Sequence, residues 1–186
     1  MERTYIKEIL AGNASRFSYF VSKYKDMAYN IAWRITGNNE DAEEIVQDAF
    51  IKVYQSLKSF RHDSKFSTWL YKIVVNAALS KTRKPKQAFK EVEEQDLGAG
   101  HTAVETAYSA LNAAEQKKYI GLALDELELE DKLLLTLYYL GENSIDEIHD
   151  ITGISTDNIK MKLHRARKKM YALLHKKLKA EVHTLL

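Results

Sequence analysis

The sequence has 186 residues, of which 45% are hydrophobic and 29% are charged, with a formal net charge of +2. A chain of this length buries one or two modest cores, so length alone leaves one domain or two open. The absence of cysteine excludes disulfides, thiolate zinc sites and cysteine nucleophiles. The N-terminus MERTYIKEILAGN has no apolar run of signal-peptide length, and no stretch approaches the roughly 20 apolar residues of a membrane helix, so we expect a cytoplasmic protein.

Helices are predicted throughout, because apolar residues recur at spacings of three and four while alternating runs of Val, Ile and Thr are missing. The first informative helix is expected to begin near Asn39, after a turn at Gly37. Its predicted core side comprises Ala42, Val46, Ala49, Phe50, Val53 and Leu57. Its outer side comprises Asp41, Glu44, Gln47, Asp48, Ile51 and Gln55. This outer side is either a solvated helix face or a partner surface, with acids for steering and an isoleucine for affinity.

A second helix is predicted at residues 66–83, FSTWLYKIVVNAALSKTR, and two of its sides carry a pattern. At about 100° per residue, one side is an apolar core stripe. It consists of Phe66, Leu70, Ile73, Val74 and Ala77. The other stripe places an aromatic ring, an amide and two cations within reach of one object. It consists of Trp69, Lys72, Asn76, Ser80 and Arg83. Trp69 is either a core residue at a helix edge or part of a binding stripe.

The stretch that follows divides the chain. The only proline is Pro85, and the stretch after it up to residue 112 is acidic, contains glycine and has no helical periodicity, so residues 84–112 are predicted to be a linker. Charge then separates along the second half. Residues 117–157 hold three cations, all lysines, whereas residues 158–180 contain nine Lys and Arg residues and no acid. Such a change of sign is typical of a surface that meets a polyanion.

A helix-turn-helix is predicted within this second half. Ser144 and Glu147 have the spacing of a capping box, and Gly153 supplies a left-handed turn before a helix that begins at Ser155 or Thr156. The apolar side of the second helix carries Ile159, Leu163, Ala166 and Met170. Its other side suits DNA, with early residues for base edges and later cations for phosphates. Base reading or its border is assigned to Asn158, Lys160, Met161, His164 and Arg165, and backbone contact to Lys162, Arg167, Lys168 and Lys169.

Three segments together resemble a known family: DAEEIVQDAF, SKFSTWLYKIVVNAA and SIDEIHDITGISTDNIKMKLHRARKKM. They are similar to regions 2 and 4 of the extracytoplasmic-function sigma factors of the sigma-70 family, which are bacterial RNA polymerase initiation factors. The resemblance implies two small helical domains joined by a flexible linker. Residues 1–83 would form region 2, residues 84–116 the linker and residues 117–186 region 4.

The resemblance also implies where each partner binds. Core RNA polymerase would be held by Asp41, Glu44, Gln47, Asp48 and Ile51. The minus-ten promoter element would be opened and a flipped base captured by Phe60, Arg61, Ser64, Lys65, Trp69, Lys72, Asn76 and Arg83, with Asn76 reading the base. The minus-thirty-five element would be bound by Asn158, Lys160, Met161, Lys162, His164, Arg165, Arg167 and Lys168. An anti-sigma protein, often membrane-anchored in the family, is implied as a further partner.

Some positions depart from the family pattern. His149 stands where a small alanine is usual, Thr152 replaces a leucine, and Glu128 lies near an expected proline. The usual arginine-serine-arginine of the reading helix appears here as Lys160, Met161 and Lys162. These changes do not alter the expected fold, but the family pattern no longer predicts which minus-thirty-five sequence is bound.

The sequence favours a sigma factor that directs promoter recognition, DNA melting and initiation at a specific regulon. No motif places a nucleophile beside a base, no histidines converge as metal ligands, and no glycine-rich phosphate loop occurs, so we expect no enzyme activity, cofactor, metal or small-molecule substrate. We expect a monomer outside its complexes. The alternative is an autonomous helix-turn-helix regulator that binds duplex DNA as a dimer.

Overall fold

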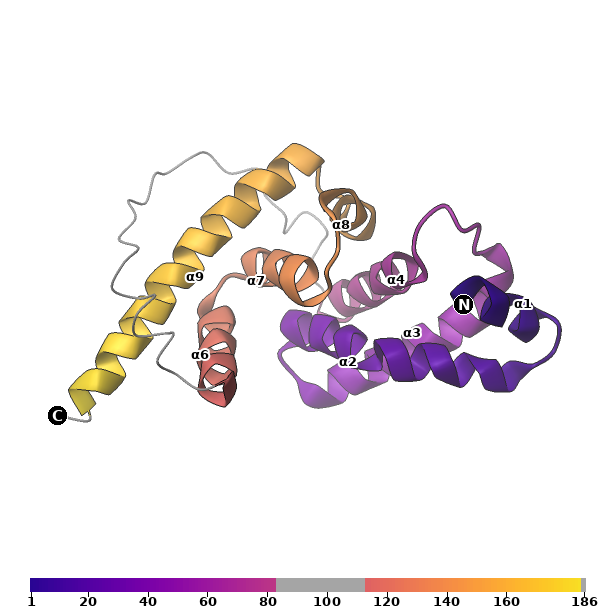
Figure 1. The fold of residues 1–186 in the computed structure, drawn as a ribbon, viewed down its shortest axis with the longest axis horizontal. Helices are drawn as coiled ribbons and strands as arrows, with labels where there is room; N and C mark the ends of the chain where they lie inside the picture. Colours follow the sequence, from indigo (N-terminus) through magenta and orange to yellow (C-terminus); the bar gives the residue numbers. More distant parts are fainter. Residues whose placement is uncertain (83–112, 185–186) are drawn as a thin grey trace.

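The computed structural model describes residues 1–82 and 113–184, and every element in these two ranges is helical (Figure 1). The all-α prediction is therefore confirmed. The predicted linker at residues 84–112 and the site residue Arg83 lie outside the described residues. In the described ranges, no helix is both long and apolar enough to cross a membrane.

The first region is built from four α-helices and two short 3₁₀ turns. They are α1 (Glu2–Leu10), η1 (Ala14–Arg16), α2 (Phe17–Thr36), α3 (Asn39–Ser56), η2 (Leu57–Ser59) and α4 (Phe66–Lys81). Gly37 ends α2 with a φ of 71°, and the side chain of Asn38 then accepts a hydrogen bond from the amide of Asp41 at 2.8 Å. The turn at Gly37 and the start of α3 near Asn39 are as predicted, and α2 and α3 pack against each other after this turn.

The second region begins with α6 (Ala113–Glu126), earlier than the boundary expected at residue 117. It continues with α7 (Leu129–Leu135), the π-helical turn η4 (Thr136–Leu140), α8 (Ile145–Thr152) and α9 (Thr156–Thr184). The predicted capping box is present: the amide of Glu147 donates to Ser144 Oγ, and the amide of Ser144 donates to Glu147 Oε2. Gly153 has a φ of 79°, so α8 and α9 form the expected helix-turn-helix.

The two regions pack against each other and share one continuous hydrophobic core. Figure 1 shows α8 lying beside α4, and α7 also contacts α2. The contact is close at Gly141, where an added Cβ would lie 2.8 Å from the Cε atom of Met27 in α2. Arg34 of α2 also pairs with Asp125 of α6. Residues 113–184 therefore rest on the helical bundle formed by residues 1–82.

This packing corrects the expectation for residues 66–83. Phe66, Leu70 and Val74 are buried as predicted, but Ile73 and Ala77 are only half-buried. A further arc of the helix is buried as well, at Thr68, Val75 and Leu79. Thr68 contacts Glu147 of α8, and Val75 and Leu79 lie on the same side of the helix. The sequence pattern of α4 did not indicate that a second helix covers this side.

Candidate nucleic-acid interface

The outer face of α3 is exposed, as the sequence predicted. Gln47 and Asp48 are exposed, and Ile51 keeps 55% of its surface accessible. Asp41 and Glu44 both pair with Lys81 at the end of α4, at 3.0 and 2.6 Å. The structure thus brings the five residues assigned to polymerase binding onto one face, and two of their acids share a cation from the neighbouring helix.

A chain of aromatic rings leads from the core of region 2 to the loop before α4. Phe20 is fully buried, and its ring centroid lies 4.3 Å from that of Phe66. Phe66 contacts Phe60 and Trp69 in turn, with centroids 5.9 and 6.0 Å away. Phe60 and Trp69 stack on each other at 5.0 Å and an interplanar angle of 25°. Trp69 is half-buried against the core, and the rest of its surface lies beside the loop, so its membership of a binding stripe stays a prediction.

The other residues assigned to the minus-ten element lie around this ring pair. Arg61, Lys65 and Lys72 are exposed, whereas Ser64 and Asn76 are half-buried. The loop turns sharply at His62, which has a φ of 61°. Side chains long enough to reach a polyanion therefore surround a stacking surface, an arrangement that suits an unpaired nucleic-acid strand.

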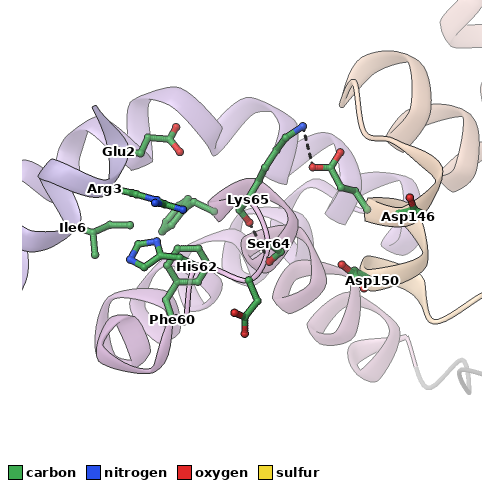
Figure 2. A pocket seen from close by; sticks show the side chains of 12 residues that line it. Glu2, Arg3, Ile6, Phe60, His62, Ser64, Lys65, Asp146 and Asp150 are labelled. Atoms are coloured by element: carbon green, nitrogen blue, oxygen red, sulfur yellow. Dashed lines mark hydrogen bonds and ion pairs between the residues drawn. The ribbon is translucent and has the colours of Figure 1, made fainter.

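A cavity of about 470 Å³ opens between this loop, α1 and α8. Figure 2 shows Phe60, His62, Ser64 and Lys65 on its loop side and Asp146 and Asp150 on its α8 side. Glu147 of α8 spans the two regions. Its Oε1 atom pairs with Lys65 Nζ at 2.9 Å, while its Oε2 atom caps α8. Burial opposes ionisation of Glu147, but the Ser144 amide and Lys65 together lower its pKa below the usual value.

The first turns of α9 carry the residues assigned to the minus-thirty-five element. Lys160, Met161 and His164 are exposed, as is Arg167, and Met161 keeps 46% of its surface accessible. The remaining residues of this set, apart from Lys162, are half-buried: Asn158, Arg165, Lys168 and Lys169. Ile159, Leu163 and Ala166 are buried on the opposite side, as predicted.

Lys162 differs from the placement expected of a flanking phosphate contact. It retains only 4% of its surface and pairs with Glu130 of α7, Nζ to Oε2, at 2.9 Å. Lys169 pairs with the neighbouring Asp131 at 2.6 Å. Burial raises the pKa of the Glu130 carboxyl above its usual value, and Lys162 opposes the shift. The sequence analysis did not identify Glu130 or Asp131 as partners of these lysines. The only sequence signal for the two ion pairs was that the acids are adjacent and that Lys162 and Lys169 are seven positions apart, on one side of a helix.

Comparison with known proteins shows the family. Residues 20–88 match the family model described as Sigma-70 region 2, and residues 117–170 match that of Sigma-70 region 4. The ECF RNA polymerase sigma factor SigW of Bacillus subtilis is 34% identical over 173 residues, covering 87% of this chain and 90% of the relative. The chain belongs to the extracytoplasmic-function sigma factors. The ECF RNA polymerase sigma-E factor of Haemophilus influenzae is 27% identical, covering 89% and 91%.

Solved structures agree on the fold of this sigma factor. CnrH, solved with the cytosolic domain of CnrY, is similar with a TM-score of 0.64 and 20% identity, covering 94% of this chain and 97% of CnrH. RpoE of Bartonella quintana, solved with the anti-sigma factor NepR, has a TM-score of 0.63 at 21% identity, covering 86% and 96%. Like its family, this chain is an RNA polymerase sigma factor for transcription initiation, and sigma factors are not enzymes in the usual sense.

Proposed function

We propose that this sigma factor directs RNA polymerase to a defined set of promoters through three surfaces. The loop at residues 60–65 and α4 bind the minus-ten element, the start of α9 binds the minus-thirty-five element, and the outer face of α3 holds the polymerase core. The observation that carries the proposal is the stacked pair Phe60 and Trp69, with exposed Lys72 and half-buried Asn76 three and seven positions after Trp69 on the same side of α4.

Melting is driven by capture of an unpaired base. Stacking on an aromatic side chain is worth about 1–3 kcal/mol per base, and extruding a base costs a few kcal/mol. The two terms are similar in size, so cations that neutralise phosphates decide the balance. Arg61, Lys65 and Lys72 are the exposed cations of this surface. No nucleotide hydrolysis by this chain is required in this scheme.

The reading helix α9 enters the major groove with its first turns. Met161 and His164 are exposed three positions apart, so they face the same way and approach base edges together. Lys160 and Arg167 are exposed on either side of them and contact phosphates. Base contacts give the sequence preference, while phosphate contacts set position along the duplex.

A protein partner restrains this chain in the cytoplasm, where the polymerase acts. Support comes from solved sigma factors of the same fold: RpoE was solved with the anti-sigma factor NepR, and CnrH with the cytosolic domain of CnrY. Region 2 would end near residue 83, and region 4 would begin with α6 at Ala113, four residues before the boundary predicted at residue 117. The anti-sigma protein would bind the chain and keep both promoter-reading surfaces from the polymerase complex.

Transcription in vitro tests the proposal. Purified core polymerase, the chain and a library of promoter-length duplexes are mixed, and start sites are read by sequencing. Defined starts are expected only when the chain is present. Asn76→Ala should change the base preference at the minus-ten element, and Asp48→Arg should abolish activity through lost core binding. Glu43→Arg, an equal change at an exposed position on another side of α3, is the matched control and should keep activity.

The opposite result has a clear form. If the chain alone binds a duplex tightly as a dimer and adds no start sites to the core enzyme, it acts as an autonomous regulator. The surface around Trp69 would then have another role. If Glu43→Arg fails as completely as Asp48→Arg, the assignment of the α3 face is wrong.

A further inference from the structure

Two adjacent acids in the first turn of α7 form ion pairs with α9, the proposed reading helix, at two positions. Glu130 pairs with Lys162 at 2.9 Å, and Asp131 pairs with Lys169 at 2.6 Å. The two lysines are seven residues apart, so they lie about two helical turns apart on nearly the same side of α9. We call these four residues the α7–α9 clamp. Two pairs along one helix fix both its rotation and its position along its axis.

The clamp lies directly behind the proposed base-reading surface. Lys162 follows Met161 in the chain, and consecutive helical residues point about 100° apart. The side chain of Lys162 is 5% exposed while Met161 is 46% exposed. Holding Lys162 inward against Glu130 therefore determines which way Met161 and, three residues later, His164 point. A small rotation of α9 would move both away from the base edges.

The Glu130–Lys162 pair is poorly suited to a purely stabilising role. Taking two charges out of water costs more than their attraction returns unless further hydrogen bonds satisfy them. Glu130 Oε1 is buried without a hydrogen-bond partner among the described residues, and burial raises the pKa of this carboxyl despite the neighbouring lysine. An apolar pair of similar volume would often be as stable or more stable at such a site. What apolar side chains cannot supply is a directional contact.

We propose that Glu130 and Asp131 are positioning residues that set the minus-thirty-five preference by holding Lys162 and Lys169 and hence the orientation of the reading helix. The inference rests on the proposed function, in which α9 reads this element. It also reassigns Lys162, which contacts Glu130 in place of a phosphate. Well-made base contacts discriminate about five- to a hundredfold against a wrong base, so misalignment by a fraction of a turn is measurable as lost preference.

The test compares base preference with stability in the same variants. Holoenzyme is assembled from core polymerase and full-length chain, and bound duplexes are selected from a library with a fixed minus-ten region and a randomised minus-thirty-five region. The double variant Glu130→Leu with Lys162→Met removes both buried charges. We expect its melting temperature to equal or exceed that of the wild type, while its preference for the best site over single mismatches falls at least about fivefold.

Conservative variants and a matched control distinguish the orientation of α9 from a general effect of removing charge. Lys162→Arg keeps the pair and should keep the preference, and the exchange Glu130→Lys with Lys162→Glu should retain more of it than the apolar double variant. The control is Glu126→Leu with Lys177→Met, which removes an ion pair between α6 and the later part of α9. It should leave the preference unchanged, because that pair lies more than three turns beyond the reading residues.

Two results would overturn the inference. If the apolar double variant keeps the wild-type preference, the clamp is structural only. If Lys162→Met weakens binding equally on all sequences and lowers the salt dependence by about one phosphate contact, Lys162 binds the backbone directly. Failure of the proposed function looks different, since wild-type holoenzyme would then show no minus-thirty-five preference from which to measure a loss.

Discussion

The two regions hold the side chains that we propose to read the promoter by different means. In region 2, rings in contact run from fully buried Phe20 through Phe66 to the Phe60–Trp69 pair beside the loop. In region 4, the core beneath the reading helix is aliphatic, and buried ion pairs join α9 to α7. Packed rings fix the position of a surface through close steric contact, whereas an ion pair also fixes the direction in which a side chain points.

The contrast suits what each surface is proposed to contact. An aromatic ring can stack on the face of any base, so region 2 needs a ring held firmly in place more than it needs a fixed rotation of α4 about its axis. Reading base edges in a groove depends on the angle of each side chain, so region 4 needs the rotation of α9 to be defined. The substitutions below test whether ring packing supports region 2 and ion pairs support region 4. They are given from the largest expected effect to the smallest.

Phe66→Ala should have the largest effect. Phe66 is 2% exposed and contacts Phe20, Phe60 and Trp69, so its loss leaves a cavity that the rings cannot fill. We expect the free energy of unfolding to fall by about 3–5 kcal/mol, measured by urea denaturation. Tyr54→Ala deletes a ring that is 43% exposed and serves as the control, with a smaller loss. Equal losses would mean that the ring chain does not support region 2.

Asp131→Asn should have an intermediate effect. The substitution keeps the shape of a buried side chain but removes the charge that faces Lys169. A hydrogen bond to a charged group contributes about 1.5–3 kcal/mol, and we expect a loss of that order in chemical unfolding. Asp157→Asn breaks an exposed ion pair with Lys160 on the same helix and should cost about 0.5 kcal/mol or less. If both variants lose the same amount, burial does not strengthen the clamp.

Lys65→Met should have the smallest effect, on the contact between the regions. Lys65 is 67% exposed in its pair with Glu147, and such pairs contribute about 0–1 kcal/mol. Because the chain has no cysteine, spin labels can be placed at Gln55→Cys and Leu140→Cys, both exposed, to report the distance between regions. The close-distance population should fall by about fivefold at most. Lys58→Met, at an exposed position on η2, should leave it unchanged.

The same labels test the pH dependence of this contact. The pKa of Glu147 is lowered in the folded chain, so its ionised form contributes stability above the unfolded value of 4.5. That contribution is lost as the pH falls through the lowered folded pKa. Wild type should therefore separate more readily than at neutral pH once the pH is below about 4.5, and Lys65→Met should show a smaller change. An equal change in both would mean that other carboxylates govern the contact.

The sequence predicted what local chemistry decides. The turn at Gly37, the capping box of Ser144 with Glu147 and the turn at Gly153 follow from backbone preferences, and the structure contains all three. The exposed side of α9 was also predicted at Lys160, Met161 and His164, because its apolar residues repeat at helical spacing.

The sequence did not predict contacts between distant elements. Lys162 was placed among the phosphate contacts because a helical wheel shows only its own helix, and Glu130 lies 32 residues away in the chain. Thr68 is buried where it contacts Glu147 of α8, and nothing in residues 66–83 encodes that neighbour. Both errors have one cause: a long side chain or a mixed helix face takes its role from the surface packed against it.

The contact between α4 and α8 limits how far apart the two proposed DNA-binding surfaces can lie. The minus-ten and minus-thirty-five elements are centred about 25 base pairs apart, which is roughly 85 Å of duplex at 3.4 Å per step. In Figure 1, α8 lies beside α4, and Glu147 bonds to both Lys65 and Thr68. The reading helix begins only a few residues after α8, at Thr156. If α4 and α9 bind the two elements as proposed, a chain that spans an unbent promoter must give up the Glu147 contacts, and the packed form and the promoter-bound form exclude each other.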